Sequence, residues 1–91
     1  MKVYIAGKIT GNKQYKEQFA QAQKQLEQEG HIVLNPAVLP EGMKPADYMR
    51  ICLSMIECSD IVAMLPNHLE STGASIEMNL ADYTGKKIRF L

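Results

Sequence analysis

The stretch VYIAG, from Val3 to Gly7, is a short run of apolar, β-favouring residues that stops at a glycine. A run of this kind, bounded by a turn signal, is typical of a strand buried in a parallel sheet. From about Asn12 to Glu29 the pattern changes, and apolar residues recur at steps of four, three and four among Gln, Lys and Glu. These apolar residues are Tyr15, Phe19, Ala22 and Leu26. The spacing predicts an amphipathic helix with Asn12 as its cap and Gly30 as its stop.

A second strand is predicted over residues 31–34, since His31-Ile32-Val33-Leu34 is closed by Asn35-Pro36. The residue before a proline is pushed out of helical geometry, which ends the run. Strand, helix and strand in this order form a βαβ unit. A right-handed crossover then places the two strands parallel to each other.

The rest of the chain repeats this alternation. After a loop through Pro40, Gly42 and Pro45, the pattern predicts a helix over 46–58, a strand over 60–65, a helix over 71–83 stopped by Gly85, and a strand over 87–90. Residues expected on one face of the second helix are Tyr48, Ile51, Cys52, Met55 and Ile56, with Asp47 near its start. We therefore predict a three-layer α/β/α fold with a doubly wound, mainly parallel four-stranded sheet of Rossmann-like or flavodoxin-like type.

Size and composition set limits on function. With 91 residues, 46% of them hydrophobic, the chain has material for one core, so we expect a single domain over 1–91. Ten Lys and Arg balance ten Asp and Glu, which disfavours long nucleic acid as a partner and favours a small molecule. No basic and apolar leader and no stretch of membrane-span length occurs, so a cytoplasmic, membrane-free protein is expected.

Cys52 and Cys58 are the chain's two cysteines, and they lie in one predicted helical segment. They lack the paired spacing of a zinc site, and two cysteines are few for a disulfide scaffold. We expect reduced thiols, no metal site and no cofactor.

A ligand crevice is expected beyond the carboxyl ends of the strands, near the point where the strand order reverses. The loop Gly7-Lys8-Ile9-Thr10-Gly11 lies there, with glycines that let the backbone approach an anion and a lysine that neutralises it. These features fit a phosphate group. An equally good reading is a plain βα turn with a solvated lysine, because the spacing is neither a Walker loop nor a dinucleotide fingerprint.

A second candidate segment is Ser71-Thr72-Gly73-Ala74-Ser75-Ile76-Glu77, which brings hydroxyls and small residues to a helix start and a carboxylate about one turn inside. The helix dipole is expected to favour the ionised form of Glu77, which suits a nucleophile. The structural alternative is a glutamate that only stabilises the helix. Tyr4 either projects its hydroxyl into the crevice or packs under a helix, and His68 is expected at the loop surface.

These residues resemble the nucleoside 2-deoxyribosyltransferase superfamily, which includes deoxynucleoside 5′-monophosphate N-glycosidases and small relatives of about this length. The resemblance covers nearly the whole chain. The matching segments are Val3-Tyr4-Ile5-Ala6-Gly7, Tyr48-Met49-Arg50, Asp60-Ile61-Val62, Leu65-Pro66, and Ser71-x-Gly73-Ala74-x-x-Glu77-x-x-x-Ala81 followed by Gly85.

The resemblance implies roles for individual residues. The glutamate that matches Glu77 is the nucleophile that attacks the anomeric carbon and releases the base, and the tyrosine that matches Tyr4 helps to hold it. The loop that matches 8–11, together with Ser71, resembles the phosphate site of the monophosphate glycosidases. A serine rather than an acid at position 71 favours a phosphorylated ligand.

One position departs from the family pattern. The superfamily usually has an aspartate eight residues before the strand-three acid, where it handles protons on the leaving base, but counting back from Asp60 gives Cys52. A thiol is a poorer proton donor than a positioned carboxylic acid, and loss of general-acid help typically costs about 10² to 10⁴ in rate. The small relatives also tend to carry Gly-Trp where this chain has Asn67-His68, and His68 is a candidate for the missing acid function.

Three functions follow as expectations. The first is an N-glycosidase or 2-deoxyribosyltransferase-like enzyme that acts on a small nucleoside or nucleotide through Glu77. The second is a non-catalytic nucleotide-binding protein, which Cys52 favours. The third is an interaction domain with a vestigial pocket. Because the family's active sites are often completed by a neighbouring subunit, the resemblance also implies a homodimer or larger assembly.

Overall fold

The computed structural model describes residues 1–91 and contains four strands, three α-helices and two short 3-10 helices. In chain order they are β1 (Lys2–Ala6), α1 (Tyr15–Gln28), β2 (Ile32–Leu34), η1 (Pro36–Val38), α2 (Pro45–Glu57), β3 (Ile61–Met64), η2 (Pro66–Glu70), α3 (Thr72–Tyr83) and β4 (Lys87–Phe90). None of the helices has the length and apolar character that crossing a membrane requires.

The four strands form one parallel sheet in the order β2-β1-β3-β4. Strand β1 is central, and Tyr4 lies opposite Leu34 of β2 on one side and Val62 of β3 on the other. The chain moves outward from β1 to β2 and then crosses to β3 on the opposite side of β1. The strand order therefore reverses between β1 and β3, where ligands bind in open parallel sheets.

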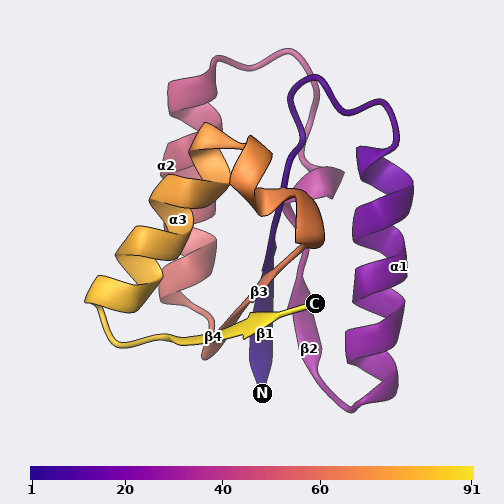
Figure 1. The fold of residues 1–91 in the computed structure, drawn as a ribbon, viewed down its shortest axis with the longest axis vertical. Helices are drawn as coiled ribbons and strands as arrows, with labels where there is room; N and C mark the ends of the chain where they lie inside the picture. Colours follow the sequence, from indigo (N-terminus) through magenta and orange to yellow (C-terminus); the bar gives the residue numbers. More distant parts are fainter.

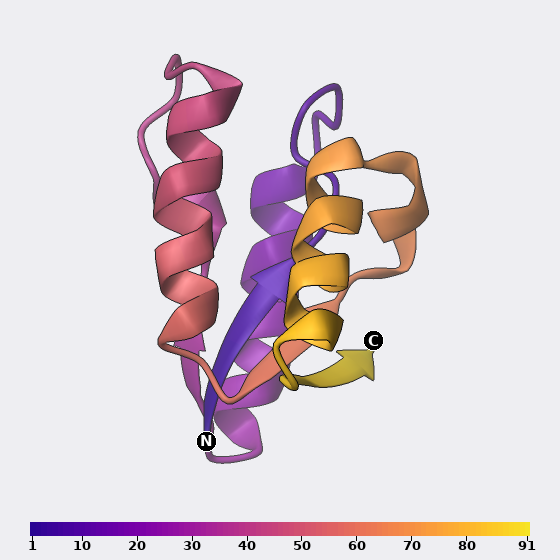
Figure 2. The same ribbon diagram turned by 90° about the vertical axis from the view of Figure 1, so that its left-hand side faces the viewer.

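The helices cover both faces of the sheet. Helix α1 lies on one face, and α2 and α3 lie together on the other (Figures 1 and 2). Alternation along β1 separates two cores, because Val3 and Ile5 point toward α1 whereas Tyr4 and Ala6 point toward α2 and α3. The α1 core also contains Phe19, Ala22, Leu26, Ala37, Ile61, Ala63 and Leu65. The other core also contains Cys52, Ile56, Val62, Met64, Ala74 and Ala81. The predicted three-layer α/β/α fold is thus confirmed.

The ends of α1 and α2 differ from those predicted. Helix α1 begins at Tyr15 rather than Asn12, because the Asn12 side chain accepts a hydrogen bond from the backbone N–H of Gln14 and forms a turn before the helix. Helix α2 begins at Pro45, which suits the first helical position since its missing N–H would have no partner there. The predicted apolar face of α2 is also wrong in part, because the Ile51 side chain is exposed.

The two 3-10 helices were not predicted. Each begins at a proline, Pro36 or Pro66, separated by one residue from the end of a strand, where the sequence indicated only the end of the strand. The Asn35 side chain caps the first of them by accepting a hydrogen bond from the N–H of Ala37. Both turns lie at the carboxyl edge of the sheet, so they shape the loops around the expected crevice.

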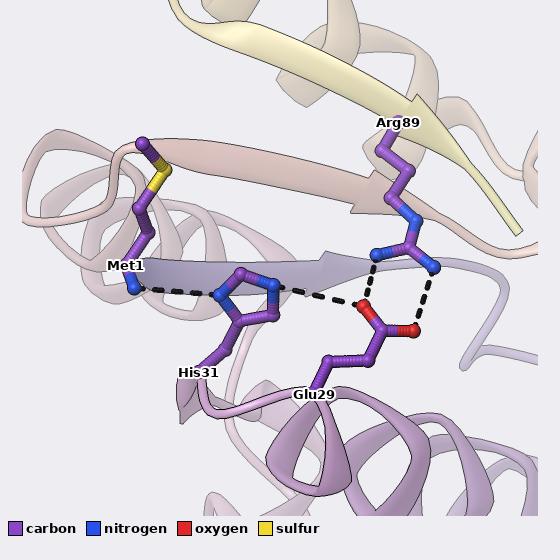
Figure 3. A network of polar contacts seen from close by, with 4 residues as sticks. All are labelled: Met1, Glu29, His31 and Arg89. Carbon is purple, nitrogen blue, oxygen red and sulfur yellow. Dashed lines mark hydrogen bonds and ion pairs between the residues drawn. The ribbon is translucent and has the colours of Figure 1, made fainter.

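Charged side chains link elements at the opposite end of the sheet and on the α1 face. Arg89 of β4 makes a bidentate ion pair with Glu29 at the end of α1, with distances of 2.5 and 2.9 Å (Figure 3). His31 lies 3.6 Å from the same carboxylate and 3.4 Å from the Met1 amino group. This network joins α1 to β4, the strand that lies farthest from β2 in the sheet.

Candidate functional site

Tyr4 and Glu77 form the best-defined polar contact in the interior. The Tyr4 hydroxyl donates a hydrogen bond of 2.6 Å to Glu77 Oε2, and the two residues are only 1% and 6% exposed. Tyr4 comes from the central strand, and Glu77 lies five residues after Thr72, the first residue of α3. The contact links residues 73 positions apart in the sequence. The expectation that Tyr4 lies near this carboxylate, which came from the family resemblance, agrees with the geometry.

Burial governs the charge of Glu77. It raises the pKa of the carboxyl group from 4.5 to about 7, against the opposing effect of the Tyr4 hydrogen bond and of the nearby Cys52 thiol. The expectation that the ionised form is favoured is therefore wrong, because burial of the carboxyl group outweighs any favourable effect of the helix dipole. Both the carboxylate and the protonated form are therefore accessible near neutral pH.

The two carboxyl oxygens of Glu77 have different surroundings. Oε2 accepts the Tyr4 hydrogen bond, whereas Oε1 has no partner within the protein. Every side-chain nitrogen or oxygen that is fully buried in this protein has a hydrogen-bond partner. Because Oε1 has none, it must be accessible to solvent. The arrangement holds one oxygen in place and leaves the other available to a ligand.

Cys52 of α2 is the third member of this cluster, and its side chain is 7% exposed. The thiol lies near enough to Tyr4 and Glu77 to influence both, although its contacts fall short of full hydrogen-bond geometry. Burial raises the pKa of the Cys52 thiol, and the neighbouring Glu77 carboxylate raises it further. The pKa of Tyr4 is likewise raised, first by burial and then by Glu77. Both groups are therefore neutral hydrogen-bond donors at neutral pH.

The loop after β1 is held against the loop after β3. The Lys8 N–H donates to the Asn67 side chain at 3.1 Å. At Gly7, a Cβ would approach Leu65 Cδ1 to 2.7 Å, so only glycine fits without a shift. Gly11 has a φ of +76°, which also favours glycine. These contacts support a structural role for both glycines, whichever ligand the loop accepts.

The remaining loop residues reach different environments. Ile9 packs against the α1 core, whereas Thr10 is exposed. The Lys8 side chain is half-buried and takes part in no ion pair. Within the predicted phosphate loop, Lys8 is thus the residue with a free charge, and Ile9 belongs to the core.

The start of α3 lies at the same end of the molecule as the β1 loop (Figures 1 and 2). Ser71 is its N-cap, and the Ser71 hydroxyl accepts a hydrogen bond from the N–H of Ala74 at 3.1 Å. The N–H groups of the first helical turn, those of Thr72 and Gly73, have no acceptor within the helix. A Cβ at Gly73 would make ordinary contact with Met49 at 3.8 Å, so packing does not require glycine there.

Two other sequence candidates lie away from Glu77. His68 Nδ1 is 2.7 Å from the Leu65 carbonyl oxygen, and its ring packs beside Phe90 at 5.5 Å between centroids. Asp60 accepts a hydrogen bond from the Lys2 N–H at 2.9 Å, which holds the pKa of its carboxyl group below the usual range. Neither residue makes a hydrogen bond or an ion pair with Tyr4 or Glu77, so the proposal that His68 replaces the missing acid gains no support from these contacts.

Sequence reasoning missed an amide cluster at the carboxyl edge. The Gln18 side chain accepts from Asn12 at 2.8 Å and from Asn67 at 3.2 Å, and Asn67 in turn accepts from Lys8. These amides fix the β1 loop to α1 and η2. The only sequence signal was the presence of asparagines in both loops, which does not reveal their pairing.

Two surface hollows lie away from Glu77. One, of about 520 Å³, lies between α1 and the segment 35–41, and the other, of about 360 Å³, is lined by Leu65–Asn67, α1 and Leu91. Both lie on the α1 side of the sheet. We place the candidate site at Glu77 because of its chemistry. A buried carboxyl group that accepts a hydrogen bond from a tyrosine is a more specific indication of a functional site than a surface hollow. Nowhere do three or more His, Cys, Asp or Glu side chains gather in a way that could hold a metal ion, and both cysteines are free.

Fold and site together define a flavodoxin-like parallel α/β domain with a tyrosine-held glutamate on the face that α2 and α3 cover. The chain belongs to the family described as "Domain of unknown function (DUF4406)", whose model matches residues 1–90. No curated protein shows a significant match to it.

A solved structure has the same fold. The 2-deoxyribosyltransferase from the psychrotolerant bacterium Bacillus psychrosaccharolyticus superposes with a TM-score of 0.77 at 24% sequence identity. The match covers 99% of this chain and 71% of that one. That enzyme is described as a biocatalyst for the synthesis of nucleosides. At this level of identity the similarity demonstrates the fold.

Proposed function

We propose that the protein cleaves the N-glycosidic bond of a small nucleoside or nucleotide, with Glu77 as nucleophile and Tyr4 as the residue that orients it. The observation that carries the proposal is the geometry of Glu77, with Oε2 held by Tyr4 at 2.6 Å and Oε1 unpartnered. With a pKa of about 7, the nucleophilic carboxylate form of Glu77 is accessible at neutral pH. The fold of a 2-deoxyribosyltransferase supports the same chemistry.

The proposed reaction has two steps. Glu77 Oε1 forms a bond to the anomeric carbon while the bond from that carbon to the base nitrogen breaks, and the electron pair leaves with the base. Water, or the nitrogen of a second base, then attacks the anomeric carbon and displaces Glu77 as a carboxylate, and the attacking group loses its proton. Tyr4 keeps Oε2 hydrogen-bonded throughout, so the carboxylate does not rotate away from the sugar.

The test is base release from a panel of deoxynucleoside and ribonucleoside 5′-monophosphates, followed by chromatography. The parent protein should release free base, and Glu77→Ala and Glu77→Gln, purified in the same way, should not. Base release by either variant at the parent rate would remove Glu77 from the nucleophile role. Circular dichroism of the variants controls for loss of fold.

We further propose that a 5′-phosphate binds between the β1 loop and the start of α3. The half-buried, unpaired Lys8 and the free N–H groups of the first turn of α3 support this, since helix N-termini attract anions. The double variant Lys8→Ala with Ser71→Ala should bind a deoxynucleoside monophosphate at least about tenfold more weakly, as each lost charged hydrogen bond is worth about 1.5–3 kcal/mol. Its affinity for the unphosphorylated nucleoside is the control. Equal losses for both ligands would contradict this phosphate site.

A second candidate function is nucleotide binding without catalysis. The observation that favours it is the neutral thiol of Cys52 beside Glu77, in place of a stronger acid. It predicts that nucleotides raise the melting temperature of the protein without any release of base. Base release that depends on Glu77 would decide against it.

A further inference from the structure

The groups that surround the Glu77 carboxylate indicate which leaving groups the site can handle. The Glu77 carboxyl group accepts a hydrogen bond from Tyr4 and takes part in no ion pair, and no third His, Cys, Asp or Glu gathers with Cys52 and Glu77 into a cluster of metal-binding type. Tyr4 lies under α3 and is 1% exposed, and Cys52 reaches the pair from α2. The polar side chains that the structure shows beside the nucleophile are therefore one phenol and one thiol.

Neither group is suited to give up a proton during the reaction. The pKa of each is raised by burial and by the Glu77 carboxylate, which makes the phenolate and the thiolate still less favourable. Glycosidases that form a glycosyl-enzyme ester usually place a second carboxyl group about 5–5.5 Å from the nucleophile, and it protonates the leaving group. In this chain the nearby side chains donate hydrogen bonds but do not act as general acids.

The demand for a proton depends on the charge of the base. When a neutral nucleoside is cleaved, the base leaves with the electron pair of the broken bond and becomes an anion unless it is protonated. When the base is a ring cation, such as an N7-alkylated purine or a pyridinium, the same electron pair neutralises it. The second kind of leaving group departs as a neutral molecule without any acid.

We propose that this site is suited to N-glycosides whose base carries a positive charge, and that the thiol of Cys52 keeps the nucleophile's surroundings neutral rather than protonating the leaving base. The inference rests on the proposed function and narrows it to a substrate class. It is carried by the position of Cys52 beside Tyr4 and Glu77 on the α2 and α3 face of the sheet.

The experiment compares two substrates that differ by one methyl group, N7-methyl-2′-deoxyguanosine 5′-monophosphate and 2′-deoxyguanosine 5′-monophosphate. The rate of base release is measured for the parent, and release in the presence of Glu77→Gln is subtracted as spontaneous loss. The parent should release the methylated base at least about 10² times faster, because a general acid is worth about 10² to 10⁴ in rate and the unmethylated base receives no such help. The variant Cys52→Ser should keep this preference.

Three results would contradict either this inference or the proposed function. Rates within tenfold of each other would overturn the inference and leave the proposed function standing. A preference that increases in Cys52→Ser would also overturn it, since the thiol would then have been protonating the unmethylated base. Release of neither base above the Glu77→Gln background would overturn the proposed function itself.

Discussion

Replacing Glu77 by glutamine should stabilise the protein above pH 7. Burial raises the pKa of this carboxyl group from 4.5 to about 7, so the folded state resists an ionisation that the unfolded state undergoes freely. Below pH 4.5 the group is protonated in both states and carries no penalty. As the pH rises from 4.5 to 7 the penalty increases by about 1.4 kcal/mol per pH unit, to about 3 kcal/mol, and it then stays constant.

The measurement is urea unfolding of the parent and of Glu77→Gln at pH 4, 6 and 8. Glutamine has nearly the same shape and its side-chain oxygen still accepts the Tyr4 hydrogen bond, so the difference between the proteins isolates the charge. The free energies of unfolding should be similar at pH 4 and differ by up to about 3 kcal/mol at pH 8, with the variant more stable. A difference that does not depend on pH, or a variant that is less stable at pH 8, would refute the reasoning. Loss of activity combined with gain of stability is expected of a residue kept for function.

Two further changes test the surroundings of the site. In Tyr4→Phe the Glu77 carboxylate loses a hydrogen bond worth about 1.5–3 kcal/mol, so the pKa of Glu77 should rise by about one to two units. The pH midpoint of base release should move upward with this pKa. An unchanged midpoint would show that Tyr4 does not stabilise the carboxylate. Gly7→Ala brings a methyl group to 2.7 Å from Leu65 and should lower the free energy of unfolding, measured in urea, by about 1–3 kcal/mol. Gly73→Ala makes only ordinary contact within a helix and should raise the free energy of unfolding by about 0.5–1 kcal/mol. Equal effects of the two alanines would contradict the close packing of the β1 loop.

The sequence was sufficient for the order and type of the main elements. Val3–Ala6 and Ile61–Leu65 are apolar runs with clear stops, and Phe19, Ala22 and Leu26 follow a helical period, so the strand and helix assignments rest on burial patterns that hold in the structure. The ends of the helices and strands were less predictable, because a polar side chain near an end can form one of several local hydrogen bonds. Asn12, for example, forms a turn instead of capping the helix.

The proximity of three candidate residues was predictable, but their electrostatics were not. Tyr4, Cys52 and Glu77 were identified from position and family resemblance, and the fold brings them together. The direction of the Glu77 pKa was missed, because the sequence shows a helix start but does not show that α2 and the sheet exclude water from the carboxyl group. Asn67 was missed as a link between loops for a similar reason, since its partner Lys8 is 59 residues away.

The central claim is that Glu77 attacks the sugar. Its most direct test is mass spectrometry of the protein after a brief reaction with a deoxynucleotide that it cleaves, followed by acid quench and peptide mapping. The account predicts that the peptide containing Glu77 gains the mass of deoxyribose 5-phosphate less one water, the glycosyl ester, and that Glu77→Gln shows no such gain. Base release by the parent with the adduct on a different residue, or undiminished release by Glu77→Gln, would contradict it.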